Sequence, residues 1–152
     1  MRPIILALAL VVAQFGIAAA PAYADKAPIY TSILNNTALG GYDAVSFFDE
    51  AGRVKGVKAH STVYEGAEFR FANAENLAKF KADPAAYAPQ YGGYCAWAVS
   101  QGYTAKGDPK HARIVDGKLY LNYNKSIQEK WDADRANFIT LADENWPTVL
   151  KD

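Results

Sequence analysis

The sequence predicts a small α+β domain, and three observations support this fold class. Residues 42–48 mix β-branched and aromatic residues, as strands do. Glu65-Gly66 and Asp116-Gly117 each separate two short segments of strand character, which indicates two antiparallel hairpins. Helical spacing of apolar residues follows each hairpin. We therefore expect small antiparallel hairpins packed against three to four helices in a single compact domain, with no internal repeat.

The first 24 residues have the pattern of a secretory signal peptide. A basic start precedes an almost wholly apolar run over 4–20, and Ala22-Tyr23-Ala24 is a cleavage signal of the A-x-A type. The alternative is a membrane anchor, but the run is short for a span and no basic flank follows it. We expect the mature chain to start at Asp25, to carry no transmembrane segment and to be periplasmic or secreted.

The charges of the chain are balanced. There are 16 Lys and Arg residues against 16 Asp and Glu, and removing Arg2 with the signal leaves a net charge of about −1. A balanced surface has no field that attracts nucleic acid or an anionic membrane. The expected partner is therefore a metal ion or a small molecule, and not a nucleic acid.

The first half of the mature chain should contain a lead-in, a strand, a hairpin and a helix. Residues 25–40 form a polar lead-in, and the domain itself spans 41–152. The first hairpin pairs 61–64 with 67–71. Asn73 is a suitable N-cap for a helix over about 74–83. Pro84 then either ends that helix or opens a second short turn.

The second half should contain a short helix, a hairpin and a final helical region. Gly93 to Gln101 is typical of a short helix, and the second hairpin pairs 112–115 with 118–123. Asn124 or Ser126 can cap the last region. One helix face there is apolar apart from Asp134 and Asn145, and it contains the following residues: Ile127, Trp131, Asp134, Phe138, Leu141 and Asn145.

Cys95 is the only cysteine, so an exported chain cannot use it for an internal disulfide. It follows Gly92-Gly93 and stands where a short helix starts, so backbone N–H groups would lower its pKa. Tyr91 and Tyr94 flank it and would support the site. The alternative is an inert, buried thiol packed among aromatic rings.

One function that these residues allow is metal binding. Cys95, His60 and His111 supply one thiol and two imidazoles, a set that suits copper or zinc. No Met remains after signal removal, which excludes a methionine-rich Cu(I) site. Asp43 lies within an apolar segment, and if it were buried near Cys95 it would raise the pKa of the thiol and favour a bound metal or an inert thiol over a reactive one.

The segments Tyr64–Phe71 and Phe80–Tyr87 contain an aromatic residue, a glycine turn, an aromatic-x-Phe strand and a closing Asp-Pro-x-x-Tyr. This pattern resembles the YHS domain. Gly41–Phe48, Tyr91–Ala96 and Asp116–Asn124 look like the exported bacterial subfamily, in which some members carry selenocysteine at the position of Cys95. This resemblance implies that Cys95 is functional.

The resemblance does not imply the metal site of the forms attached to copper-transporting ATPases. Those forms place cysteines where this chain has Ser46, Ala72 and Asn76. Three functions therefore remain open. The first is a non-enzymatic binding module for a transition metal, with Cys95 as ligand and His60 or His111 completing the site. The second is a thiol redox protein that uses Cys95. The third is a structural or interaction domain presenting its Tyr and Trp residues.

Overall fold

The structure is a computed structural model that describes residues 25–151, so the expected signal peptide lies outside the described residues. It confirms the α+β class, with two hairpins and five α-helices rather than three to four within the described range. The elements are, in order, η1 (Leu39–Gly41), η2 (Val45–Phe48), β1 (Val57–Tyr64), β2 (Ala67–Phe71), α1 (Ala74–Ala82), α2 (Pro84–Tyr87), η3 (Gln90–Gly93), α3 (Ala96–Ser100), β3 (Asp108–Val115), β4 (Lys118–Asn122), α4 (Lys125–Ala133), α5 (Arg135–Asn145) and η4 (Thr148–Lys151).

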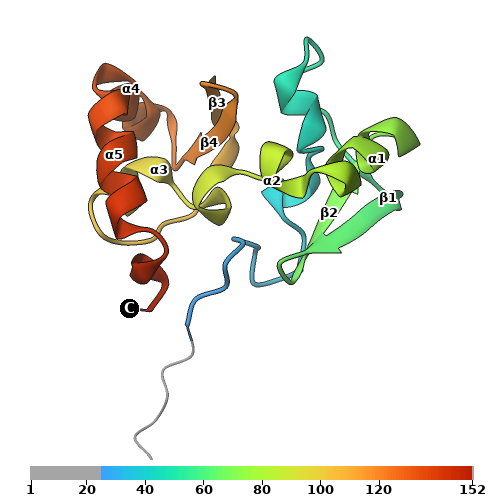
Figure 1. The fold of residues 1–152 in the computed structure, drawn as a ribbon, viewed down its shortest axis with the longest axis horizontal. Coiled ribbons are helices and arrows are strands. Elements are labelled where there is room, and N and C mark those ends of the chain that lie inside the picture. Colours follow the sequence, from blue (N-terminus) through green and yellow to red (C-terminus); the bar gives the residue numbers. More distant parts are fainter. Residues whose placement is uncertain (1–24, 152) are drawn as a thin grey trace, which may run out of the picture.

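The fold consists of two copies of one unit, which the sequence analysis missed. The first unit spans 39–87 and the second 91–138, and in each a 3₁₀ turn, a short helix, a hairpin and two helices follow in the same order. Figure 1 shows the two hairpins and their helices on opposite sides of the molecule. The expectation of no internal repeat is therefore wrong.

The backbone of the two units agrees in its irregular features as well. Leu39–Gly41 has φ values of 53°, 58° and 80°, and Tyr91–Gly93 has 53°, 60° and 85°. Both hairpins interrupt their register at the same place in the first strand. Asn73 and Asn124 both cap the helix that follows, each accepting from a backbone N–H group. The turns and helix caps are therefore repeated in the two units, although most of the side chains differ.

Two expected elements differ from the structure. Residues 42–48 do not form a strand, because Asp43 accepts hydrogen bonds from the amides of Val45 and Ser46 and turns the chain into η2. The final helical region breaks at Asp134, whose φ of −149° and ψ of 50° separate α4 from α5. An aspartate competes for backbone hydrogen bonds and so favours helix ends over interiors.

The two units share buried surface. Phe69, Phe71 and Phe80 stack in the first core cluster, and Leu119 and Leu121 of the second unit pack into that same cluster. The second cluster is built around Trp131 and its neighbouring tyrosines. Burial of Leu119 and Leu121 in the first core holds the units together as one body.

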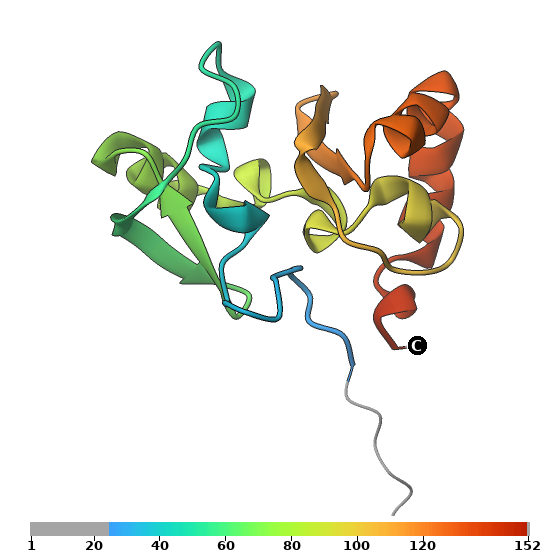
Figure 2. The same ribbon diagram turned by 180° about the vertical axis from the view of Figure 1, so that it is seen from behind.

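The lead-in segment 25–40 joins both units. Tyr30 donates its N–H to the carbonyl of Gly92 in the second unit at 2.9 Å, and Ala38 donates to Glu68 in the first unit at 2.9 Å. Figure 2 shows this blue segment running along one edge of the molecule between the two units. Within residues 25–151, every helix is too short or too polar to cross a membrane.

Candidate functional site

Cys95 is held by a turn and by a strand from far along the chain. Gly92 and Gly93 adopt left-handed φ values that turn the backbone ahead of it. Cys95 then donates its N–H to the carbonyl of Ala105 at 2.9 Å and pairs as an isolated bridge with Leu121 of β4. Helix α3 begins only at Ala96, so the expected helix from Gly93 is shorter than predicted. The result is a thiol with only 1% of its residue surface exposed.

Backbone amides surround the Cys95 sulfur, but burial outweighs them. Burial raises the pKa of the thiol above its ordinary value, while the amides of Ala98, Tyr123 and Trp97 lower it by a smaller amount. The pKa therefore shifts upward, opposite to the direction expected from the sequence. At neutral pH the thiol is mostly protonated, and its Sγ lies 3.7 Å from Oδ1 of Asn122, the acceptor for the S–H group.

Cys95 is one of the residues that line an apolar pocket of about 230 Å³. Trp97 and Tyr103 form one side with their rings edge to face, and Tyr123 and Ile127 form another part of the lining. Tyr103 and Tyr123 are exposed at the rim. Lys106 and Lys130 place their ammonium groups 5.4 Å and 5.8 Å from the ring centres of Tyr123 and Trp97. The pocket therefore combines an apolar lining with a cationic surround.

Asp43 occupies the same place in the first unit that Cys95 occupies in the second. Each residue comes two positions after the left-handed triplet. Each also donates its backbone N–H to a corresponding carbonyl, that of Val54 for Asp43 and that of Ala105 for Cys95. Asp43 is fully buried, and all of its hydrogen-bond partners belong to the first unit. Asp43 is therefore the counterpart of the Cys95 site and does not act on the thiol.

The Asp43 carboxylate is fully satisfied. Its Oδ1 accepts from the amides of Val45 at 2.9 Å and Ser46 at 3.3 Å. Its Oδ2 accepts from the amide of Ala72 at 2.9 Å and from Nδ2 of Asn76 at 2.7 Å. Such hydrogen bonds to a buried carboxylate compensate for its loss of water.

The same amides recur around Cys95. Trp97, Ala98 and Tyr123 are the counterparts of Val45, Ser46 and Ala72, and these are the three residues whose amides face the sulfur. The fourth donor is missing, because Ile127 stands where the first unit has Asn76. The second unit therefore keeps the amides that bind a carboxylate in the first unit and presents them to a thiol.

Asn122 belongs to this site, although the sequence analysis did not select it. It is fully buried, and its Oδ1 accepts from the amide of Trp97 at 3.2 Å besides facing the Cys95 sulfur. Its Nδ2 is buried with no acceptor among the described residues. The first unit has Phe71 at this position. Aligning the two repeats could have identified Asn122 from the sequence, because the second unit has a side-chain amide where the first unit has the buried ring of Phe71.

The two histidines lie on the hairpins. His60 is half-buried in β1 and His111 is half-buried in β3, at corresponding positions of the two units. Within residues 25–151, no three His, Cys, Asp or Glu side chains gather closely enough to hold a metal ion. The structure thus does not bring Cys95, His60 and His111 into one such group, and the copper or zinc site stays a prediction.

The other residues predicted to support the site fix the turn before Cys95. Tyr91 donates its hydroxyl to Asp143 at 2.8 Å, and burial together with Asp143 raises the pKa of Tyr91 far above its ordinary value. Tyr94 donates its hydroxyl to the carbonyl of Ala27 at 2.9 Å. Gly92 lies directly against the carbonyl of Pro28. These contacts anchor the turn to α5 and to the lead-in segment.

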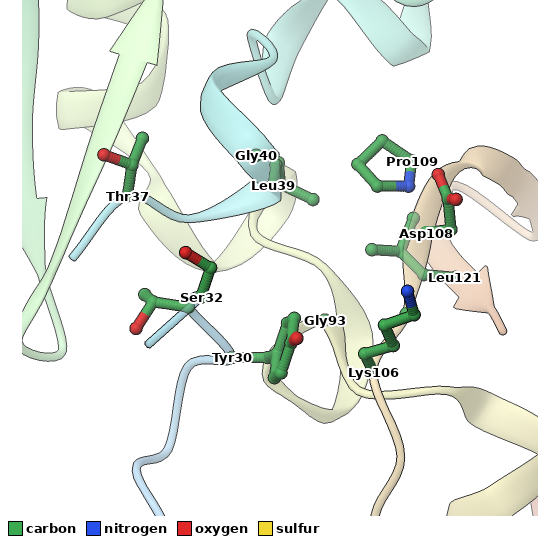
Figure 3. Close-up of a pocket in the computed structure, with 12 residues that line it drawn as sticks. Tyr30, Ser32, Thr37, Leu39, Gly40, Gly93, Lys106, Asp108, Pro109 and Leu121 are labelled. Atoms are coloured by element: carbon green, nitrogen blue, oxygen red, sulfur yellow. The ribbon is translucent and has the colours of Figure 1, made fainter. Parts of the chain in front are cut away.

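A second pocket of about 140 Å³ lies at the junction of the two units (Figure 3). Tyr30 and Thr37 line it from the lead-in segment, Lys106 lines it from the loop before β3, and Asp108 is the first residue of β3. Asp108 already accepts a hydrogen bond from the amide of Lys110 at 2.8 Å. This pocket does not include Cys95, so we place the candidate site at the apolar pocket.

No protein-family model, no curated protein and no solved structure matches this chain. The resemblance to the YHS domain therefore stays a prediction from the motifs.

Proposed function

We propose that this protein is an exported thiol redox protein in which Cys95 is oxidised by small apolar hydroperoxides. One observation carries the proposal: the Cys95 sulfur lies beside three amides whose counterparts bind a carboxylate, and Cys95 is among the residues that line an apolar pocket of about 230 Å³. The amides favour negative charge at sulfur, although burial opposes it and keeps the pKa of the thiol raised, and we propose that an apolar oxidant reaches the sulfur through the pocket. The signal-peptide pattern of residues 1–24 supports export.

The reaction is a transfer of one oxygen atom. The thiol loses its proton, and the thiolate attacks the outer oxygen of the hydroperoxide. The O–O bond breaks, an S–O bond forms, and the leaving alkoxide takes up a proton. Sulfur is oxidised by two electrons to the sulfenic acid, and the hydroperoxide is reduced to an alcohol. The amides of Trp97, Ala98 and Tyr123 stabilise the negative charge on sulfur during the attack.

Because the sequence has no second cysteine, the chain cannot regenerate the Cys95 thiol itself, so repeated turnover needs a small external thiol that reduces the sulfenic acid. A protein with a single thiol cannot form an internal disulfide as a resolving step. We therefore propose stoichiometric oxidation, as in a sensor or a scavenger, and not rapid catalytic turnover.

The pocket sets the preference for the oxidant. Trp97, Tyr103 and Tyr123 offer apolar surface, and burying an apolar group of the hydroperoxide against them stabilises the complex. Hydrogen peroxide has no such group to bury. We expect an aromatic hydroperoxide to react faster than hydrogen peroxide, in contrast to the behaviour of an exposed thiol.

The test is to oxidise the protein that begins at Asp25 with cumene hydroperoxide or with hydrogen peroxide. Peptide mass spectrometry should find one added oxygen on Cys95. The ratio of the rate with cumene hydroperoxide to the rate with hydrogen peroxide should be higher for the protein than for free glutathione under the same conditions. Tyr103→Ala should lower this preference by roughly fivefold, because it removes one wall of the pocket. A Cys95 that stays reduced while glutathione is oxidised, or a preference equal to that of glutathione, would refute the proposal.

A further inference from the structure

The surroundings of Cys95 leave hydrogen-bonding capacity unused in the reduced protein. The thiol makes no side-chain hydrogen bond to the amides at the start of α3, whereas Asp43 bonds the corresponding amides in the first unit. A neutral thiol is a weak acceptor. Nδ2 of Asn122, fully buried in the same site, also has no acceptor among residues 25–151. The amide of Trp97 donates to Oδ1 of Asn122, so the reduced sulfur serves the amides of Ala98 and Tyr123 only as a weak acceptor, and Nδ2 of Asn122 stays without one.

We propose that the site is built to hold Cys95 as its sulfinate, which takes the place that the Asp43 carboxylate has in the first unit. A cysteine sulfinate carries two oxygens and one negative charge one carbon from the backbone, as an aspartate does. The amides of Trp97, Ala98 and Tyr123 then donate to the sulfinate oxygens, as the amides of Val45, Ser46 and Ala72 donate to Asp43. This inference rests on the proposed oxidation of Cys95.

Asn122 changes its role with the oxidation state of Cys95. In the reduced protein its Oδ1 faces the sulfur at 3.7 Å and accepts from the amide of Trp97. A sulfinate has no hydrogen to donate and repels this oxygen. Rotation of the side-chain amide brings Nδ2 to the sulfinate instead and frees the Trp97 amide to donate to it as well. The rotated Asn122 supplies the fourth donor that Asn76 supplies to Asp43 in the first unit.

The second oxidation balances in the same way as the first. The sulfenic acid attacks the outer oxygen of a second hydroperoxide, the O–O bond breaks, and a second S–O bond forms. Sulfur loses two more electrons and a second alcohol leaves. The sulfinic acid gives up its proton and remains as the anion. Because no second cysteine can intercept the sulfenic acid within the chain, the second step is open to it.

The consequence is that oxidation stabilises the protein. The amides exchange a neutral thiol, which accepts weakly, for a charged acceptor, and Nδ2 of Asn122 gains an acceptor that it lacked, as when a good capping residue replaces a poor one. We expect the sulfinate form to unfold at a temperature higher by roughly 3 °C than the reduced form. In an ordinary buried core the same oxidation would insert a charge without partners and lower the unfolding temperature.

The first experiment compares the melting temperature of the reduced protein with that of protein oxidised by cumene hydroperoxide until peptide mass spectrometry finds two oxygens on Cys95. A higher melting temperature for the oxidised form supports the inference. An equal or lower one overturns it. Asn122→Leu tests the rotation, because leucine cannot donate. The gain on oxidation should shrink in this variant, and an undiminished gain would refute the role of Asn122.

The second experiment does not need the oxidation to occur, so it separates the two proposals. Cys95→Asp imitates the sulfinate, and Cys95→Ser is the matched control without the charge. At pH 7 we expect Cys95→Asp to melt above Cys95→Ser by a few degrees, roughly 3 °C. If Cys95 resists hydroperoxides while Cys95→Asp is the more stable, only the proposed oxidation fails. If Cys95→Asp melts below Cys95→Ser, the anion site is refuted.

Discussion

The two units of this protein have the same backbone arrangement but place different residues at its centre, Asp43 in the first unit and Cys95 in the second. In the first unit, three amides and Asn76 surround a buried carboxylate, Asp43, and every one of these donors has an acceptor. In the second unit the corresponding amides surround the Cys95 thiol, which leaves donors unsatisfied. In the first unit, the arrangement of amides therefore stabilises a buried carboxylate. In the second unit, the same arrangement surrounds a thiol and gives up part of that stabilisation.

The pockets beside Asp43 and Cys95 also differ, in the polarity of the residues that line them. The pocket beside Asp43, of about 300 Å³, is lined mainly by polar residues such as Ser46, Asn73 and Glu75. The pocket beside Cys95 has Trp97, Tyr103 and other apolar residues instead. A polar surround lets water compete for any ligand, whereas an apolar one favours apolar molecules. The second unit therefore has both the thiol of the proposed oxidation and the pocket that better suits an apolar molecule.

Removing the carboxylate from the first unit should have the largest effect. Asp43→Ala leaves three backbone amides and Nδ2 of Asn76 without their buried acceptor. We expect a loss of about 4 kcal/mol in the free energy of unfolding, measured by urea denaturation. The matched change Cys95→Ala should cost only about 1 kcal/mol, because it removes one buried sulfur and no strong acceptor. Equal losses at the two positions would contradict the different roles.

A second comparison uses the paired glycines Gly40 and Gly92, which have nearly the same φ of 58° and 60°. A Cβ at Gly40 meets no atom within 4 Å, whereas one at Gly92 collides with the carbonyl of Pro28. Gly40→Ala should cost about 1 kcal/mol for the left-handed backbone alone. Gly92→Ala should cost about 3 kcal/mol, because the lead-in segment must also shift. Thermal denaturation of both variants would measure this, and a similar cost would argue against the tight packing of Pro28.

The fourth donor can be moved from one unit to the other. Ile127→Asn places in the second unit the amide that Asn76 provides in the first. A donor to the sulfur should lower the pKa of Cys95 and raise its rate of alkylation by iodoacetamide at pH 7 roughly tenfold. An unchanged rate would mean that the introduced amide does not reach the sulfur. The reverse change, Asn76→Ile, should destabilise the first unit by about 2 kcal/mol.

The smallest expected effect is a dependence of stability on pH that comes from Cys95. Burial raises the pKa of the folded thiol above that of the unfolded chain, about 8.5, so the folded protein retains the proton longer. The contribution is complete below pH 8.5 and is lost as the pH rises above it toward the folded pKa, because the unfolded state ionises first. Above about pH 8.5 the protein should lose stability with rising pH more steeply than Cys95→Ser does, as urea denaturation at a series of pH values would measure. If the free energies of unfolding of the two proteins, measured in urea, changed equally with pH, the raised pKa would be excluded.

Local features of the fold were predictable from the sequence. Both hairpins form around Glu65-Gly66 and Asp116-Gly117, where the two glycines have φ of 83° and 70°. Asn73 caps α1 as expected, and Asn124 is the one of the two proposed caps that the structure uses. The turn at Gly92-Gly93 does direct Cys95 into the protein. Each of these depends on residues a few positions apart, which is the range over which turn and cap chemistry acts.

The sequence by itself therefore determined the α+β class, the hairpins and the position of the single thiol. Only the tertiary structure decided what the thiol touches, because Asn122 is 27 residues away and reaches it through the strand β4. The repeat, the separation of Asp43 from Cys95 and the upward shift in the thiol pKa also follow from packing. The physical reason is that burial and amide contacts depend on neighbours in space, and residues distant along the chain supply several of them.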